Sequence, residues 1–331
     1  HSNLGNLLRD LGNVQEAEFS LRKAIEIKPD LAECHSNLGN LLRDLGNVQE
    51  AEKSTRQAIK LNPNLVEAHS NLASILTDLG RLEEAKEACQ KCIELDPQGI
   101  HRITNLIYIL STLCMWDEIE KYLPYLNKIG IVGKAINPFI LMYVEDNPEN
   151  HLKRVIKYRE ENTREEIPNI NHPINTKIKI GYFSSDFNNH PVSVSITRVL
   201  ELHDQSKFEI YAYSLNKIND NYTKKIKDAV YCFREIDNLS DLEIVKLARN
   251  DQIDIAIDLN GLTKLNRISI FSYRVAPIQI NYFGYPASTG SNSFDYILAD
   301  EVLIPEKSKQ FYTEKVIYFP NSSIPSIPYN K

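Results

Sequence analysis

The chain has 331 residues, a formal net charge of −6 and a hydrophobic content of 42%. This length allows two or three domains with their own cores, and the negative charge argues against a general nucleic-acid binder, which would carry a basic face. No apolar run reaches the roughly 18 residues that span a bilayer, and no signal-peptide pattern is present. Five cysteines without a regular framework are typical of a reducing compartment. We therefore expect a cytoplasmic protein that binds neither nucleic acid nor membrane.

The N-terminal third repeats itself with a period of 34 residues. Residues 1–18 recur unchanged as residues 35–52, and a third copy begins at His69. The segment resembles the tetratricopeptide repeat (TPR) pattern, whose Leu-Gly pair, second-helix alanine and closing proline are filled here by Leu38-Gly39, Ala51 and Pro63. With a fourth, degenerate copy, residues 1–132 are predicted to form a TPR superhelix, an architecture that makes curved binding surfaces.

Asparagine occupies one position of every copy, one residue before an apolar position: Asn3, Asn37, Asn71 and Asn105. An asparagine amide both donates and accepts hydrogen bonds, so a row of them can pair with a peptide backbone whatever its side chains. The alternative is a solvated asparagine that duplication merely copied. Asn105 argues against this alternative, because it persists in the copy whose other residues have diverged. We predict a peptide-binding row.

The pattern changes in the second half of the chain. Residues 133–176 are predicted to be a helical linker, and residues 177–331 alternate between strands and helices. Strands are expected at 178–183, 208–213, 253–259, 278–283, 296–299 and 316–319. This alternation indicates a mainly parallel sheet covered by helices. Ligands of such sheets bind at the loops that follow the carboxyl ends of the strands.

Three loops follow these predicted strands, at 184–190, 260–264 and 284–290. Pro191 suits the first turn of a helix and puts His190 at its start. A histidine in this position can bond a substrate hydroxyl or phosphate, although the pattern alone favours a structural or capping histidine. The glycines of the other two loops indicate turns where backbone approaches a ligand closely. Neither a Walker A motif nor GxGxxG is present.

Together these loops resemble the O-linked N-acetylglucosamine transferase family, including its SPINDLY-like members. The matching strings are GYFSSDFNNHP, DQIDIAIDLNGLTK, APIQINYFGYPASTG, and FDYILAD followed by YTEKVIYFP. They come in the family's order and cover nearly all of residues 177–320. The family also has preceding TPR units.

The resemblance implies a TPR α-superhelix followed by the Rossmann-like first lobe of a GT-B glycosyltransferase, whose two lobes face across a cleft. It implies an inverting, metal-independent transfer of a sugar from a nucleotide donor, UDP-GlcNAc, to Ser or Thr of polypeptides held by the TPR groove, with no cofactor. The family's cleft histidine corresponds to His190 and its proposed proton shuttle to Asp251. Substrate-binding positions correspond to Thr263, Gly284, Tyr285 and Pro286.

The chain departs from the family in three ways. Val192 stands where the family often has Thr, and Asp254 stands where animal members have His. The second lobe, which holds the nucleotide and the groups facing its diphosphate, has no counterpart. We therefore expect the N-terminal portion of a longer enzyme, catalytically incomplete by itself. Two alternatives stay open: O-fucosyl transfer from GDP-fucose of the SPINDLY type, and a non-catalytic TPR scaffold.

Overall fold

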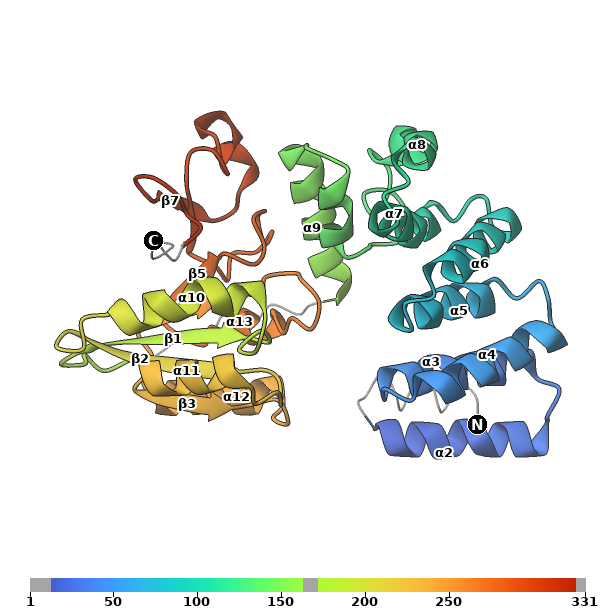
Figure 1. The fold of residues 1–331 in the computed structure, drawn as a ribbon, viewed down its shortest axis with the longest axis horizontal. Coiled ribbons are helices and arrows are strands. Elements are labelled where there is room, and N and C mark those ends of the chain that lie inside the picture. Colours follow the sequence, from blue (N-terminus) through green and yellow to red (C-terminus); the bar gives the residue numbers. More distant parts are fainter. Residues whose placement is uncertain (1–12, 163–171, 326–331) are drawn as a thin grey trace. The chain divides into compact units, whose positions relative to one another are not determined.

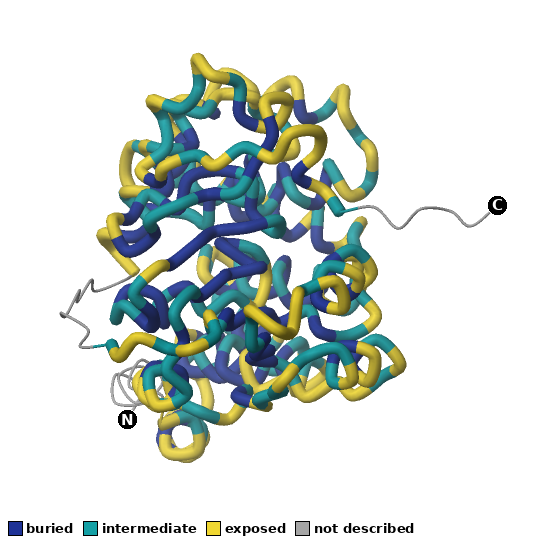
Figure 2. The backbone as a smooth tube through the Cα atoms, turned by 90° about the vertical axis from the view of Figure 1, so that its left-hand side faces the viewer, coloured by how far each residue is buried: buried dark blue, intermediate teal, exposed yellow. Residues whose placement is uncertain are grey.

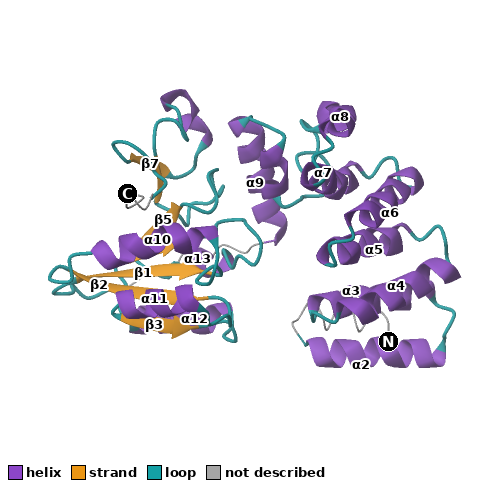
Figure 3. Ribbon diagram, in the orientation of Figure 1, coloured by secondary structure: helices purple, strands orange, loops and turns teal. Residues whose placement is uncertain are grey.

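The computed structural model describes residues 13–162 and 172–325, and the chain divides into two compact units (Figures 1 and 3). Within the described ranges, none of the helices combines the length and apolar composition that crossing a bilayer requires. We call the two units the repeat unit and the sheet unit. The repeat unit comprises His1–Ile136 and Tyr143–Glu145, and the sheet unit comprises Asn137–Met142 and Asp146–Lys331.

The repeat unit consists of helical hairpins that follow one another along the chain. After α2 (Val14–Ile27), the hairpins are α3 (Ala32–Asp44) with α4 (Val48–Leu61), α5 (Val66–Asp78) with α6 (Leu82–Leu95), and α7 (Ile103–Thr112) with α8 (Trp116–Ile119). Short 3-10 helices, η1 (Ile100–Arg102) and η2 (Glu120–Tyr125), lie before α7 and after α8. The predicted TPR fold is confirmed, and in the fourth, degenerate copy the second helix is limited to the four residues of α8.

Small residues let the two helices of a hairpin approach each other. A Cβ atom on Gly39 of α3 would lie 2.1 Å from the hydroxyl of Thr55 and 3.1 Å from the carbonyl oxygen of Ala51, both on α4. Ala51 and Thr55 are themselves fully buried. Leucines then fill the space between consecutive hairpins: Leu38, Leu41 and Leu42 pack in one cluster with Ala17, Leu21 and Ile75. This packing is the reason why the positions of Leu38, Leu41 and Leu42 are occupied by Leu or Ile in every copy.

The histidines that replace the aromatic residue of the TPR pattern have a structural role. His35 and His69 each bond, through Nε2 at 2.9 Å, the carbonyl oxygen of a proline six residues earlier, Pro29 and Pro63 respectively. Because a carbonyl only accepts, the histidine donates. Each bond ties the closing turn of one repeat to the first helix of the next.

The sheet unit is a seven-stranded parallel sheet in the order β3-β2-β1-β4-β5-β6-β7. The strands are β1 (Ile178–Ser184), β2 (Phe208–Ser214), β3 (Cys232–Glu235), β4 (Ile255–Asp258), β5 (Ile278–Tyr282), β6 (Tyr296–Ala299) and β7 (Lys315–Tyr318). The strand order reverses between β1 and β4, as in doubly wound nucleotide-binding folds. Six of these strands are those predicted; β3 was missed, because it is a short, half-exposed edge strand with no apolar run.

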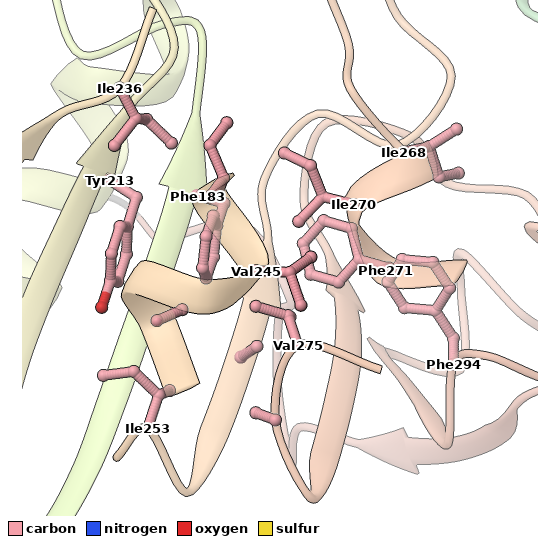
Figure 4. Close-up of a cluster of buried hydrophobic side chains, with 14 of the residues drawn as sticks. Phe183, Tyr213, Ile236, Val245, Ile253, Ile268, Ile270, Phe271, Val275 and Phe294 are labelled. Atoms are coloured by element: carbon pink, nitrogen blue, oxygen red, sulfur yellow. The ribbon is translucent and has the colours of Figure 1, made fainter. Parts of the chain in front are cut away.

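Helices cover both faces of the sheet. One core contains Ile180 and Tyr182 of β1 with Ile196 of α10 (Pro191–Leu202) and Ile226 of α11 (Asn221–Ala229). The other core contains Phe183 and Tyr213 with side chains of α12 (Asp241–Asn250) and α13 (Ser269–Ser272) (Figure 4). Successive residues of β1 and β2 contribute to opposite cores, because side chains alternate between the two faces of a strand. Most residues of these two strands are buried (Figure 2). A last 3-10 helix, η4 (Glu306–Phe311), precedes β7.

The described helices within the predicted linker over 133–176 pack against the sheet unit. Helix α9 (Pro148–Asn162) belongs to the sheet unit, where Val155 is fully buried in the same core as Phe183 and Phe271. The 3-10 helix η3 (Pro138–Tyr143) contributes Phe139 to this core. The apolar residues of α9 do not follow the 34-residue period, because this helix packs within the sheet unit and not against a further hairpin.

Candidate functional site

The loops that follow β1 and β4 are joined by the side chain of Asn260. Its Oδ1 accepts the backbone N–H of Ser185 at 2.7 Å, and its Nδ2 donates to the Ser185 hydroxyl at 2.8 Å and to Oδ2 of Asp186 at 2.9 Å. Asn260 is 1% exposed, so these bonds form in a protected environment and hold both loops in one arrangement. Two of the three predicted ligand-binding loops therefore meet at the carboxyl edge of the sheet.

Asp258, the last residue of β4, supports this turn. Its two carboxyl oxygens accept the backbone N–H groups of Asn260 at 3.0 Å and Gly261 at 3.1 Å. Burial raises the pKa of Asp258 to about 7, while the two amide donors act in the opposite direction. Thr263 closes the same turn, because its hydroxyl donates to the carbonyl oxygen of Asn260 at 3.0 Å.

His190 begins helix α10 and keeps much of its ring open. Its Nδ1 accepts the backbone N–H of Val192 at 3.3 Å, which makes it the N-cap, with Pro191 in the first turn. The side chain is 44% exposed, and Nδ1 lies 3.8 Å from Oδ2 of Asp186. The capping role that the pattern favoured is therefore present. Since Nδ1 accepts, the neutral ring carries its hydrogen on Nε2, where it can donate outward.

The loop after β5 approaches the loop after β4 so closely that glycine is required. A Cβ atom on Gly284 would lie 2.1 Å from the carbonyl oxygen of Leu259, and one on Gly261 would lie 2.2 Å from Cβ of Tyr285. Gly261 also has a φ of +58°. The third predicted loop is thereby brought to the other two. The glycines are required for contacts within the protein, Gly284 with a backbone carbonyl and Gly261 with the Tyr285 side chain.

Tyr285 and Pro286, both predicted to bind substrate, differ in their surroundings. The Tyr285 side chain is 1% exposed and its ring lies 6.3 Å from that of Phe139. Pro286 is half-buried, and its carbonyl oxygen accepts the hydroxyl of Tyr312 at 3.1 Å. Any contact of Tyr285 with a substrate would have to use its backbone, because its ring is enclosed.

A buried glutamate that sequence reasoning missed holds the end of this loop. Glu314 is 4% exposed and accepts the hydroxyl of Ser288 at 2.8 Å and the backbone N–H of Thr289 at 2.7 Å. It also accepts the hydroxyls of Thr289 and Thr313. Glu314 lies 25 or 26 residues from its partners in the loop. No spacing pattern could identify it, although it lies in the string YTEKVIYFP.

Asp251 is not at this edge of the sheet. It follows α12, before the amino end of β4, whereas Asn260 follows the carboxyl end; the four residues of β4 span roughly 13 Å. Its carboxylate accepts the hydroxyl of Tyr213 at 2.7 Å and Nη2 of Arg234 at 2.6 Å. The structure does not bring Asp251 together with His190. Its role as a proton shuttle stays a prediction that only the resemblance supports.

Asp254, which stands where animal members of the family have His, also lies before β4. It accepts Nε2 of His172 and the backbone N–H of Lys179, each at 2.7 Å, and Nδ2 of Asn175 at 2.9 Å. These bonds anchor the segment that enters β1. Asp254 therefore has a local structural function at the edge opposite to Asn260.

The asparagine row lies on the first helices of the repeat hairpins. Asn3 is outside the described residues, and Asn37, Asn71 and Asn105 are half-buried on α3, α5 and α7. Nδ2 of Asn71 donates to the carbonyl oxygen and the hydroxyl of Ser36, at 3.2 and 3.0 Å. Asn71 thus uses its donor side to join consecutive hairpins, and its acceptor oxygen is the part left for other interactions.

Family models match both halves of the chain. Tetratricopeptide repeat models match residues 5–46, 32–65 and 66–98. The model of glycosyl transferase family 41 matches residues 157–324, which is half of the chain.

Curated relatives agree with this match. The chain is 30% identical over 210 residues to the probable UDP-N-acetylglucosamine–peptide N-acetylglucosaminyltransferase SEC of Arabidopsis thaliana, covering 60% of this chain and 21% of that protein. It is 37% identical over 150 residues to the UDP-N-acetylglucosamine–peptide N-acetylglucosaminyltransferase of Caenorhabditis elegans, covering 44% and 13%. The chain thus spans about a fifth or less of the length of these relatives.

A solved structure has the same fold over almost the whole chain. A mutant of the Thermobaculum terrenum O-GlcNAc transferase aligns with a TM-score of 0.60 at 24% identity, covering 98% of this chain and 58% of that one. This likeness concerns the fold, whereas the family model rests on the sequence of the sheet unit itself. With TPR hairpins, a parallel sheet and three joined loops at its carboxyl edge, the chain belongs to glycosyl transferase family 41.

Proposed function

We propose that this protein takes part in transferring a sugar from a nucleotide donor to Ser or Thr hydroxyls of polypeptides, with GlcNAc from UDP-GlcNAc as the preferred donor. The observation that carries the proposal is the joining of three loops through Asn260 and Gly284 at the carboxyl edge of a family 41 sheet. Ligands of doubly wound sheets bind at that edge, beside the point where the strand order reverses. The Arabidopsis and Caenorhabditis relatives are named as peptide N-acetylglucosaminyltransferases, which favours this donor.

The chemistry needs a group that contacts the reacting oxygens. The acceptor oxygen forms a bond to the anomeric carbon while the bond from this carbon to the diphosphate breaks. Negative charge develops on the departing diphosphate, which can take up the proton of the hydroxyl. His190 is half-exposed beside the joined loops, and its Nε2–H can donate to a phosphate or hydroxyl oxygen. We assign this contact to His190.

We infer a single displacement, and hence inversion at the anomeric carbon, from the resemblance to the family. In this step the acceptor hydroxyl attacks the sugar directly, without a covalent glycosyl intermediate on the protein.

The proposal is tested with the full-length protein, which is incubated with a mixture of acceptor proteins and either UDP-GlcNAc or GDP-fucose. We expect mass spectrometry to detect one N-acetylhexosamine on Ser or Thr, and the NMR coupling of the anomeric proton in the product peptide to show a linkage inverted from that of the donor. A deoxyhexose instead would establish the SPINDLY-type alternative. No modification with either donor would contradict a transferase function and favour the TPR scaffold.

We further propose that the asparagine row binds the acceptor backbone. Replacing Asn37, Asn71 and Asn105 together by Ala should raise KM for protein acceptors, because each lost hydrogen bond costs about 1 kcal/mol. Donor hydrolysis should stay unchanged. Steady-state kinetics with a protein acceptor and with water as acceptor measure both.

Asn13 and Asn47 provide a matched control for this row. They recur with the same period of 34, but lie exposed at the starts of α2 and α4 and make no side-chain capping bond. Their double replacement by Ala should leave both activities unchanged. If KM for protein acceptors rose equally in the triple and the double variant, or in neither of them, a peptide-binding row would be contradicted.

A further inference from the structure

We propose that the capping box of α11, made by Asp220 and Thr223, positions the loop that carries His190. These two residues are thus positioning residues for the transfer reaction. The inference rests on the proposed function for the role of His190. The contacts themselves do not depend on that role, and they can be measured separately.

Asp220 divides its carboxylate between two tasks. Oδ1 accepts the backbone N–H groups of Tyr222 at 2.9 Å and Thr223 at 3.0 Å, as an N-cap does. Oδ2 accepts the backbone N–H of Asn189 at 2.5 Å, one residue before His190 and 31 residues away along the chain. An N-cap needs only one oxygen. The second oxygen therefore has a separate partner, which lies in the loop after β1.

Thr223 also reaches beyond its own helix. Its hydroxyl accepts the N–H of Asp220 at 3.2 Å, which completes the capping box, and donates to the carbonyl oxygen of Phe187 at 2.8 Å. Thr223 is 2% exposed and Phe187 is fully buried. This bond therefore fixes the backbone three residues before His190 in a protected environment.

A third bond comes from the helix that His190 itself begins. The hydroxyl of Ser193 on α10 donates to the carbonyl oxygen of Asp186 at 2.6 Å. Side chains of two helices thus hold the backbone at Asp186, Phe187 and Asn189, immediately before His190. Hydrogen bonds from the backbone N–H of Thr223, and to a smaller extent of Asn189 and Tyr222, lower the pKa of Asp220, although desolvation acts in the opposite direction. Asp220 is therefore a carboxylate at neutral pH.

The consequence concerns geometry rather than binding affinity. An imidazole acts on a reacting oxygen only within hydrogen-bond distance, and an error near 1 Å can lower a rate by about a hundredfold. Loosening the loop should therefore lower kcat of transfer and leave KM for the donor unchanged. A cap that served only to stabilise α11 would lower the melting temperature and leave kcat as it was.

The chain offers a matched control in the next helix. Ser240 and Glu243 form the same capping box on α12: the Ser240 hydroxyl accepts the N–H of Glu243 at 3.4 Å, and Glu243 accepts the N–H of Ser240 at 2.8 Å. None of the bonds described for these two residues involves the loop 184–190. Losing this cap costs a comparable amount of helix stability without touching His190.

The experiment compares Asp220→Ser, which keeps a capping oxygen but loses the bond to Asn189, with Ser240→Ala. We expect Asp220→Ser to lower kcat about tenfold with KM unchanged. We also expect faster hydrogen exchange at the Asn189 amide and a shifted imidazole NMR signal of His190. Thr223→Val should behave in the same way, and Thr223→Ser, which keeps the hydroxyl, should restore kcat. Ser240→Ala should change none of these.

The two ideas can fail separately. If the intact protein transfers no sugar, the proposed function fails, while hydrogen exchange at Asn189 and the His190 signal still decide whether α11 holds the loop. Unchanged exchange and an unchanged His190 signal in both Asp220→Ser and Thr223→Val would overturn the positioning role. The positioning role would also be overturned if Asp220→Ser lowered kcat no more than Ser240→Ala does.

Discussion

Replacing His190 by Ala in the intact protein is expected to lower sugar transfer by about tenfold or more, the low end for a group positioned for proton transfer or substrate contact. The ring is half-exposed at the start of α10, and Nδ1 caps the helix, so the proposed contact with a substrate oxygen uses Nε2. The melting temperature should fall only slightly, because losing an N-cap costs about 1 kcal/mol. Initial rates with a saturating protein acceptor and a thermal unfolding scan measure the two effects.

His190→Asn separates the two roles of the residue. Asparagine is among the best N-cap residues, so this variant should unfold at the temperature of the native protein. It lacks the imidazole, so transfer should stay as low as in His190→Ala. Activity near that of the native protein would mean that His190 acts only as a cap, and the assignment of His190 to the substrate would be wrong.

Replacing Glu314 by Ala is expected to destabilise the sheet unit by about 3 kcal/mol or more, because buried donors lose their acceptor. The donors are the N–H and hydroxyl of Thr289 and the hydroxyls of Ser288 and Thr313. Glu314→Gln should cost far less. Its remaining carbonyl oxygen can still accept from Thr289, and the hydroxyls can rotate to accept from its amide.

Urea unfolding and hydrogen exchange at residues 284–293 measure this effect. Glu306→Ala is the control, since Glu306 is 81% exposed in its ion pair with Lys309 and such pairs contribute less than about 1 kcal/mol. Equal effects of Glu314→Ala and Glu306→Ala would show that Glu314 does not hold the loop.

Sequence patterns determined the parts of this protein that depend on local spacing. The 34-residue period and its small residues predicted the hairpins, because small side chains such as those at Gly39 and Ala51 let the two helices approach closely. The alternation of strands and helices predicted a parallel sheet and pointed to the loops at its carboxyl edge. His190 was identified as a candidate because proline follows it.

Only the tertiary structure decided which distant side chains meet. Asn260 reaches Ser185 across 75 residues, Asp220 reaches Asn189 across 31, and Glu314 reaches Thr289 across 25. These separations depend on the lengths of crossover helices and on the strand order β2-β1-β4, and neither leaves a short-range pattern. The same holds for Asp251, whose position in the motif does not tell that it precedes β4 and pairs with Arg234. Local spacing specifies the helices and strands, whereas contacts across the sheet arise only when the whole chain has folded.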